Sequence, residues 1–246
     1  MTLLPEDHTP LLERAERDIL AWEAEGFELC TVLDQEYPQN LRTVFDRPPL
    51  VFVSGRLTAQ DARSVAVIGA RRASAAGLAA ASDIARALTG GAYVVVSGLA
   101  AGVDTAAHEA ALAAGGRTVA VIGTGLRNAY PPENAALQRR IAAQGAVVSQ
   151  FWPEAHGSRT SFPQRNAVMS GLALGTVVVE ASYRSGARMQ ARLALAHGRP
   201  VFLRRALLEQ PWARELARRP GVHVIDDPSQ IMQTVERLNA TDTLVE

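Results

Sequence analysis

The sequence contains no lysine, and all 25 of its basic residues are arginines. An equal number of acidic residues balances them, so the formal net charge is zero and the whole protein carries no basic field. Any nucleic-acid site must therefore come from local clustering of arginines. Arginine grips phosphate through two hydrogen bonds and stacks on rings, which suits an anion site. A GC-rich genome, which favours arginine codons, explains the same bias without any function.

Cysteine is almost absent too, since Cys30 is the single one. One cysteine excludes a disulfide framework and a cysteine-based zinc site within the chain. Residues 1–20 lack an apolar core stretch, which argues against a signal peptide or membrane span there and predicts a cytoplasmic protein. No cofactor motif, metal-ligand cluster or paired carboxylate stands out, so we expect no cofactor, no metal and no catalytic residues.

What the chain does contain, from Arg63 onward, is short runs rich in valine and isoleucine that alternate with alanine- and leucine-rich stretches. Continuously apolar runs are typical of strands buried on both faces, so the alternation predicts a doubly wound, mostly parallel, Rossmann-like α/β sheet. The predicted strands are 65–69, 93–97, 118–123, 146–149, 176–181, 200–203 and 222–225. The predicted helices are 75–88, 103–114, 133–143, 162–172, 187–197, 211–218 and 228–238.

Residues 1–61 are predicted to form a short helical and extended lead-in. It holds one amphipathic helix over 10–26 and a strand-like stretch at 50–53, and it is too short to bury much of a core by itself. The Rossmann-like domain is expected over 62–240, with a tail over 241–246.

Ligands of an open parallel sheet bind beyond the carboxyl ends of its strands. The first such end is Gly69, which is followed by Arg71, Arg72 and Ser74. Ser74 could cap the next helix, whose free N–H groups and the two arginines would then form an anion pocket. An ordinary strand-to-helix turn with solvated arginines is the alternative.

The next two strand ends are rich in small residues that let the backbone approach a phosphate closely. The candidates there are Ser97, Gly98, Ala100, Gly102, Gly123 and Gly125. Asp104 could cap the helix or accept a hydrogen bond from a ligand hydroxyl. His108 lies one helical turn later and could face it, or the two could be a helix cap and a structural histidine. Tyr130 could stack on a base or fill a gap over the core.

Two further stretches complete the candidate rim. Arg165 and Asn166 lie near a helix start, where they offer a planar cation, an amide and free N–H groups. Glu180 ends a strand and could orient the arginines or bind ribose hydroxyls. The remaining candidates are Ser185 and Gly186, which enter a helix, and the cation Arg188.

In this order, these stretches resemble the DprA/Smf family of DNA-processing proteins, over roughly residues 23–238. The segments that carry the resemblance are Tyr37-Pro38, Pro48-Pro49-Leu50, Gly69-Ala70-Arg71, 97–108, 123–125, Tyr130-Pro131, 162–166, Glu180-Ala181 and Ser185-Gly186. The resemblance implies a Rossmann-like fold that binds single-stranded DNA without catalysis, forms a homodimer and has a RecA-type recombinase as a partner. It implies DNA contacts at Arg71, 97–102, 123–125 and Arg165-Asn166.

The chain also departs from the family pattern. Ala167 stands where the family has a second arginine, Gln150 where it has a glutamate, Gln190 where it has a threonine, and Leu203-Arg204-Arg205 where it has Pro-Gly. We expect the family's N-terminal helical domain to be cut to about one helix and no winged-helix domain to follow Leu238. These departures favour a divergent or accessory member.

Two other function classes stay open. A sensor of a small nucleotide on a related fold is favoured by the zero net charge. A nucleotide phosphoribohydrolase is suggested by a faint echo of that family's glycine-rich signature in Gly171, Gly175, Thr176 and Glu180, although the spacing is wrong.

Overall fold

The computed structural model describes residues 9–183 and 185–242 of the chain. Its strands are β1 (Phe27–Thr31), β2 (Leu50–Gly55), β3 (Ser64–Ile68), β4 (Val94–Ser97), β5 (Thr118–Val121), β6 (Ala146–Ser149), β7 (Thr176–Val178), β8 (Val201–Arg204) and β9 (Val222–Ile225). Its α-helices are α1 (Thr9–Ala24), α2 (Gln39–Arg42), α3 (Ala75–Gly90), α4 (Val103–Ala113), α5 (Ala135–Gln144), α6 (Ser161–Leu172), α7 (Gly186–Ala196), α8 (Pro211–Leu216) and α9 (Ser229–Asp242).

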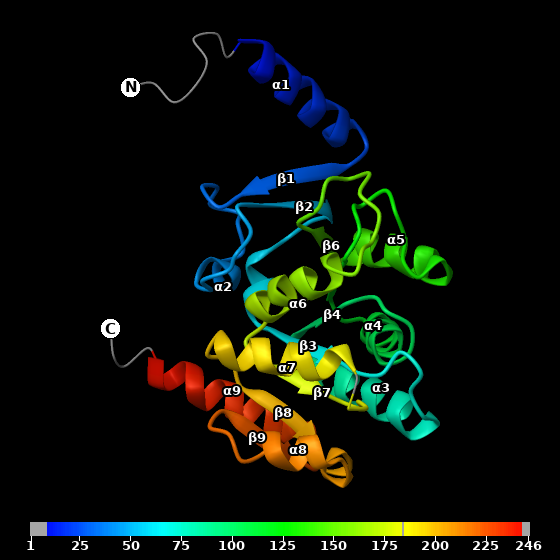
Figure 1. The fold of residues 1–246 in the computed structure, drawn as a ribbon, viewed down its shortest axis with the longest axis vertical. Coiled ribbons are helices and arrows are strands. Elements are labelled where there is room, and N and C mark those ends of the chain that lie inside the picture. Colours follow the sequence, from blue (N-terminus) through cyan, green and yellow to red (C-terminus); the bar gives the residue numbers. More distant parts are fainter. Residues whose placement is uncertain (1–8, 184, 243–246) are drawn as a thin grey trace.

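All these strands form one sheet in the order β1-β2-β6-β5-β4-β3-β7-β8-β9, with helices packed on both faces (Figure 1). The strands from β3 to β9 pair in parallel, whereas β1 and β2 pair antiparallel. The predicted doubly wound, mostly parallel sheet is therefore confirmed, and its predicted strands and helices appear with ends shifted by a few residues. Residues 243–246 of the predicted tail lie outside the described residues.

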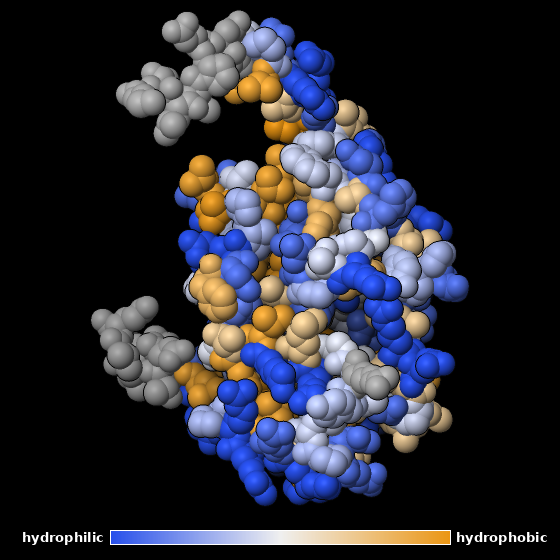
Figure 2. Space-filling view, viewed as in Figure 1, coloured by the Kyte–Doolittle hydropathy of each residue, from blue (hydrophilic) through white to orange (hydrophobic). Residues whose placement is uncertain are grey.

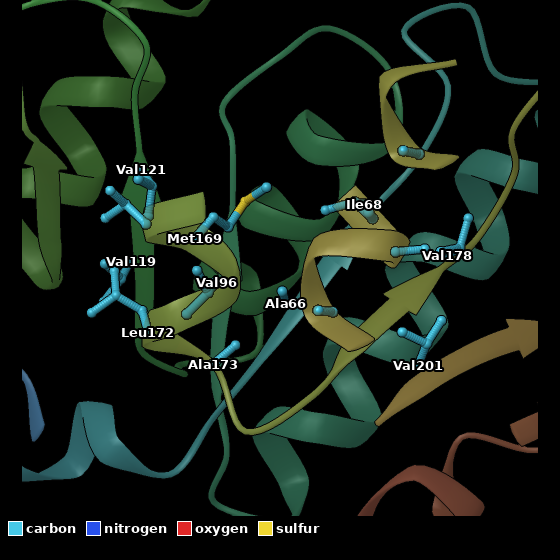
Figure 3. Close-up of a cluster of buried hydrophobic side chains, with 14 of the residues drawn as sticks. Ala66, Ile68, Val96, Val119, Val121, Met169, Leu172, Ala173, Val178 and Val201 are labelled. Atoms are coloured by element: carbon cyan, nitrogen blue, oxygen red, sulfur yellow. The ribbon is translucent and has the colours of Figure 1, made fainter. Parts of the chain in front are cut away.

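The two faces of the sheet pack against different helices because successive side chains of a strand point to opposite sides. On β3, Ala66 and Ile68 belong to the core beneath α6 and α7, whereas Val65 and Val67 belong to the core beneath α3 and α4. Figure 3 shows the first of these cores, in which Met169 of α6 lies among the strand residues. A sheet buried on both faces holds its strand ends, and the loops that follow them, in fixed places.

The lead-in segment adds two strands to the same sheet. The strand-like stretch predicted at 50–53 is confirmed as β2, whereas β1 and the pairing of both strands with the sheet were not predicted. β1 and β2 extend it beyond β6, and Trp22 of α1 packs edge-on against Phe52 of β2 with ring centroids 5.0 Å apart. The buried Tyr37 donates a hydrogen bond to the Pro48 carbonyl at 2.6 Å. Some apolar residues of the lead-in, such as Trp22, Tyr37 and Phe52, are thus buried, whereas others, such as Leu12 and Leu33, stay exposed. The domain division at residue 61 stays a prediction.

The order of the strands reverses at β3, which has β4 on one side and β7 on the other. After β3 the chain enters α3 on one face of the sheet, and after β7 it enters α7 on the other face. Such a switch point opens a crevice at the strand ends.

Much of the face in Figure 2 is hydrophilic, with hydrophobic patches beside α1 and β1. None of the helices described is long and apolar enough to cross a membrane.

Candidate functional site

A pocket of about 700 Å³ lies at the carboxyl ends of β3 and β7, between the first turns of α6 and α7. Many residues predicted from the sequence line this pocket, which places separate stretches of the chain at one site. They are Gly69, Arg71, Arg72, Ala100, Asp104, Arg165, Asn166, Glu180, Ser185 and Gly186. The other predicted residues do not line it, namely Ser74, Ser97, Gly98, Gly102, His108, Gly123, Gly125, Tyr130 and Arg188.

The exposed cations of the pocket are Arg71 and Arg72 on the loop after β3. Neither side chain forms an ion pair with a carboxylate among the residues described. The Arg71 guanidinium carbon lies 5.4 Å from the Phe162 ring centroid and 5.8 Å from that of Tyr130. The two rings lie 5.2 Å apart, and Tyr130 is 46% exposed. A free cation therefore lies beside an exposed aromatic surface.

Phe162 was not among the predicted site residues, although it opens the stretch that contains Arg165. The signal that could have found it is the spacing of this stretch. Phe162 and Arg165 are three residues apart in α6, so both face the strand ends. Phe162 lines the pocket and also packs against Tyr130 and Arg71.

Arg165 differs from Arg71 because it is buried, with only 6% of its surface exposed. Its Nη1 donates a hydrogen bond to the Val121 carbonyl at 2.8 Å, and burial lowers the pKa of its guanidinium. The buried Asp104 carboxylate opposes that effect, and burial in turn raises the pKa of Asp104. The sequence predicted Arg165 as a cation presented to phosphate. In the structure, the Arg165 side chain connects α6 to the end of β5 through its hydrogen bond to Val121.

Asp104 holds the loop that precedes it. Its Oδ2 accepts hydrogen bonds from the backbone N–H groups of Gly98 at 3.2 Å and Ala100 at 3.3 Å. Asp104 does not cap α4 as predicted, because the N-cap residue is Gly102 and no side chain caps that helix; its carboxylate holds the loop before the helix instead. The N–H groups of Gly98 and Ala100, which were expected to face phosphate, are engaged by this carboxylate.

The glycines of the strand ends serve packing between loops. Gly98, Gly123 and Gly125 are buried, and a Cβ on them would run into the Arg165 guanidinium, the Phe162 ring and the Trp152 carbonyl respectively. The sequence had predicted that these glycines leave the loop backbone open to a phosphate, whereas here other parts of the protein fill the space beside them. Gly102, with a φ of 82°, lies against the carbonyls of the loop after β3, a conformation and a closeness that L side chains do not tolerate.

The N-terminus of α3, predicted as an anion pocket, is closed by the protein itself. The Ser74 hydroxyl accepts a hydrogen bond from the Gly77 N–H at 3.0 Å, which caps the helix. The Glu180 carboxylate accepts hydrogen bonds from the Ser74 N–H at 3.0 Å and the Ser74 hydroxyl at 2.6 Å. A carboxylate thus occupies the favourable position for an anion at this helix end.

His108 makes a structural contact. Its fully buried ring lies with Nδ1 2.7 Å from the Thr118 Oγ1, and that hydroxyl donates to the Val95 carbonyl. Nδ1–H is therefore the donor to Thr118. Burial lowers the pKa of His108 to about 3, so the ring is neutral at physiological pH. The predicted contact with Asp104 is not formed.

The N-terminus of α7 is capped by a serine, as is that of α3. The Ser185 hydroxyl accepts a hydrogen bond from the Ala187 N–H at 3.2 Å and so caps the helix. Arg188 does not line the pocket, and its guanidinium carbon lies over the Tyr183 ring, 4.3 Å from the ring centroid.

The four residues that resemble the phosphoribohydrolase signature, Gly171, Gly175, Thr176 and Glu180, do not come together at one site. Gly171 packs on Leu41 and Val44, Gly175 lies against Phe202, and Thr176 is buried in β7. Of the four echo residues, Glu180 alone lines the pocket. Among the described residues, no group of three or more histidines, cysteines or carboxylates could hold a metal ion.

Comparison with known proteins agrees with this architecture. The family model of DNA recombination-mediator protein A matches residues 28–238. The DNA processing protein DprA of Streptococcus pneumoniae is 40% identical over 183 residues, which cover 74% of this chain and 64% of the relative. The chain thus spans less than two thirds of the length of that relative.

Two solved structures share the fold closely. That of DprA from Streptococcus pneumoniae superposes with a TM-score of 0.78 at 33% identity, covering 93% of this chain and 82% of the other. DNA processing protein A from Helicobacter pylori, whose structure concerns its single-stranded DNA binding mode, gives a TM-score of 0.74 at 26% identity, covering 86% and 96%. The chain belongs to the DNA recombination-mediator protein A family.

Proposed function

We propose that this protein binds single-stranded DNA at the pocket between β3 and β7 and catalyses no reaction there. The observation that carries the proposal is the group formed by Arg71, Tyr130 and Phe162, with Arg72 beside it. Two unpaired guanidinium groups can neutralise phosphates, and an exposed ring offers a surface on which a base can stack. A single strand presents both of these groups along its length.

Family membership supports the same ligand. A relative of similar fold, from Helicobacter pylori, is described by its single-stranded DNA binding mode. The absence of a basic field does not oppose the proposal, because the cations that matter lie together at one rim. We propose that the protein acts in the cytoplasm as a recombination mediator of the type found in natural transformation.

Binding of the wild-type protein to a fluorescent oligo-dT across a series of salt concentrations tests the proposal. For single strands, the logarithm of the affinity falls by about 0.7 per log unit of salt for each phosphate neutralised. Arg71 and Arg72 together lead us to expect a slope of about −1.4 or steeper. Duplex DNA of the same length is the control ligand and should bind less tightly. Absent binding at low salt, or binding independent of salt, contradicts the proposal.

The finer assembly is also a proposal. By resemblance to the family, we infer a homodimer and a RecA-type recombinase as a partner. Sedimentation velocity over a range of protein concentrations tests the dimer, and co-sedimentation with a RecA-type protein on oligo-dT tests the partner. A monomer at all concentrations, or no co-sedimentation, contradicts the respective inference.

A nucleotide sensor is the second candidate function, and one specific observation favours it. The pocket volume of about 700 Å³ falls within the range of small-ligand sites. One nucleotide could fill it without any longer strand, and the zero net charge of the chain suits such a ligand.

A further inference from the structure

The first half of α1 presents an apolar face to solvent. Leu12, Ala15, Ile19 and Trp22 follow one another at spacings of three and four residues, so they form one stripe along the helix. The stripe is buried at its last turn, where Trp22 is 9% exposed, whereas Leu12 at its start is 67% exposed and the adjacent Leu11 is 63% exposed. Grouped leucines on a helix that projects from the end of the sheet (Figure 1) mark a surface that a partner covers.

A carboxylate borders this stripe at its exposed end. Glu16 follows Leu12 by four residues and is therefore its neighbour on the helix surface. Its side chain is exposed and forms no ion pair with another described residue. The arginines of α1 do not neutralise it, because Arg14 is paired with Asp18 at 3.8 Å and Arg17 lies on the side of the helix opposite the stripe.

A groove of about 770 Å³ on the same protein is the complement of this helix face. It adjoins the pocket at β3 and β7, with which it shares Pro163 and Met189, but the rest of its lining is separate. Trp152, on the loop after β6, is 55% exposed there. The apolar lining comes from the start of β2, the loop after β6, α6 and α7, and consists mainly of Leu50, Trp152, Pro163, Ala167, Met189 and Leu193.

Arginines stand beside the part of the groove that α7 provides. Met189 and Leu193 lie one helical turn apart in α7, and so do Arg188 and Arg192, which makes an apolar row next to a cationic row. The Arg188 guanidinium lies over the Tyr183 ring, whereas Arg192 is exposed and has no carboxylate partner among the described residues. Arg192 therefore offers an uncompensated positive charge next to the apolar row.

Two charged residues belong to the described lining of the groove itself, Asp46 and Arg47. The Asp46 carboxylate lies 2.8 Å from Nε2 of His197 and is already engaged by that ring. Arg47 is exposed, and its Nη1 donates a hydrogen bond to the Val44 carbonyl at 3.1 Å, which leaves its charge without a carboxylate among the residues described. Together with the arginine row of α7, Arg47 makes the border of the groove cationic.

We propose that the exposed half of α1 docks into this groove on a second copy of the protein. The apolar stripe packs on Trp152, Met189 and Leu193 of the other copy, and Glu16 pairs with Arg192. An amphipathic helix in an apolar groove is a common mode of protein recognition. The charges select the partner, because a cationic border favours a helix with a carboxylate beside its stripe and disfavours a helix with a cation there.

The helix of one copy does not reach the groove of that same copy. Its last turn is fixed to the body, since the Trp22 ring packs edge-on against Phe52 with centroids 5.0 Å apart and lies 5.5 Å from Trp152. Leu12 is ten residues earlier, about 15 Å along the helix axis. That direction leads away from α6 and α7 (Figure 1). The inference rests on the homodimer of the proposed function and not on DNA binding.

Exchange of the two charges between copies tests the contact. Glu16→Arg places a cation against the cationic border, and Arg192→Glu places a carboxylate against that of the helix. In sedimentation velocity at low salt, each variant alone should associate about tenfold or more weakly than the wild type, because like charges then face each other. An equimolar mixture of the two variants should recover association, since each helix then meets a border of opposite sign. A variant that failed to fold would show no such recovery.

Substitutions on the two sides of α1 test the apolar part of the contact. Leu12→Ser should weaken association, because the stripe loses its most exposed leucine. Leu20→Ser is the matched control, since Leu20 is 58% exposed on a side of the helix away from the stripe. Glu13→Arg is the control for Glu16→Arg, because Glu13 is exposed and also lies away from the stripe. Both controls should associate as the wild type does.

The outcomes separate this inference from the proposed function. A wild-type protein that is monomeric at all concentrations overturns both the inference and the homodimer, whereas the DNA-binding proposal stands. Association that persists in Glu16→Arg, Arg192→Glu and Leu12→Ser means that the copies meet elsewhere, and this inference alone fails. Loss in both charge variants without recovery in their mixture shows that the two residues do not face each other, which also overturns it. Weaker oligo-dT binding by Arg192→Glu with unchanged association assigns the arginines of α7 to DNA instead.

Discussion

At the residue scale, Arg165 and Arg71 belong to the same site but play different roles, because Arg165 is buried and Arg71 is exposed. Arg165 is buried against Val121 and faces the Asp104 carboxylate, so its charge is partly compensated inside the protein. Arg71 is exposed, lies against two rings and has no carboxylate partner among the residues described. Sequence motifs treat the two residues alike. Only the second carries a charge that is available to a ligand in solvent.

Arg71→Ala should therefore weaken binding of oligo-dT by about tenfold and make its salt dependence shallower by about 0.7, the contribution of one phosphate. Salt-titrated fluorescence anisotropy measures both quantities. The matched control is Arg86→Ala, since Arg86 is exposed on α3 and paired with Asp83 rather than placed in the pocket. Equal losses in the two variants would mean that Arg71 has no specific role.

His108 gives a prediction about pH. Its pKa is about 3 in the folded protein against 6.5 in the unfolded chain, so the unfolded state takes up a proton that the folded state refuses. The contribution of His108 to stability is therefore complete above pH 6.5 and is lost as the pH falls toward 3. The slope is at most about 1.4 kcal/mol for each pH unit.

Urea unfolding at pH 7 and pH 5 should show a loss for the wild type that exceeds the loss for His108→Gln by about 2 kcal/mol. His156→Gln, at an exposed histidine, is the matched control and should behave as the wild type. A wild-type protein and a His108→Gln variant with identical pH dependence would contradict the neutral, buried state of this ring.

At the scale of elements, the site is built where loops meet helices, and glycines set the distances between them. The loop after β4 touches α6 through Gly98 and the guanidinium of Arg165, and the loop after β5 touches α6 through Gly123 and Phe162. These contacts hold α6, and with it one wall of the pocket, against the strand ends. The glycines thus position side chains that a ligand would contact.

Gly98→Ala should destabilise the fold by about 1–3 kcal/mol, because the new methyl group overlaps the Arg165 guanidinium and forces a rearrangement of buried atoms. Denaturant unfolding measures this change. Gly90→Ala is the matched control. That glycine ends α3 with open space around it, and alanine there should be neutral or stabilising by about 0.5–1 kcal/mol. Similar effects of the two substitutions would rule out a packing role for Gly98.

Much of the element order could be predicted because it follows from local patterns. Strands such as β4 and β6 are continuous apolar runs bounded by glycine or serine, and the helices between them have capping residues such as Ser74 and Ser185. The addition of β1 and β2 to the sheet could not be predicted in this way. Their pairing is set by contacts distant in sequence, such as Phe52 with Ser149.

Ten of the nineteen predicted site residues line the pocket, whereas the contacts that these residues make could not be predicted. A sequence shows that Glu180 follows a strand, but not that its carboxylate reaches Ser74, more than a hundred residues away. It likewise shows a glycine at position 98 but not the guanidinium above it. Gln190 was visible as a departure from the family pattern, whereas its burial and its unpaired amide required coordinates.

At the scale of the whole molecule, a protein with no net charge can attract an anionic ligand only through a local group of cations. The strand order reverses at β3, and the loops after β3 and β7 meet around the pocket there. The charge of the chain sums to zero, so no long-range attraction aids an oligonucleotide over a mononucleotide. What favours the longer ligand is the number of its phosphates and bases that reach Arg71, Arg72 and Tyr130 at once.

Thermal unfolding with ligands therefore distinguishes the two candidate functions for the whole protein. A ligand present at a hundred times its Kd stabilises the folded state by about 2.7 kcal/mol, which for a chain of this size raises the Tm by roughly 5–10 °C. We expect this shift with oligo-dT at low salt, and much less with thymidine monophosphate or ATP at the same phosphate concentration. Added salt should reduce the shift for the oligonucleotide, since counterion release drives its binding. The opposite order, with a mononucleotide raising the Tm and oligo-dT having no effect, would assign the pocket to a nucleotide sensor, because a strand gains nothing from a site that only one nucleotide can enter.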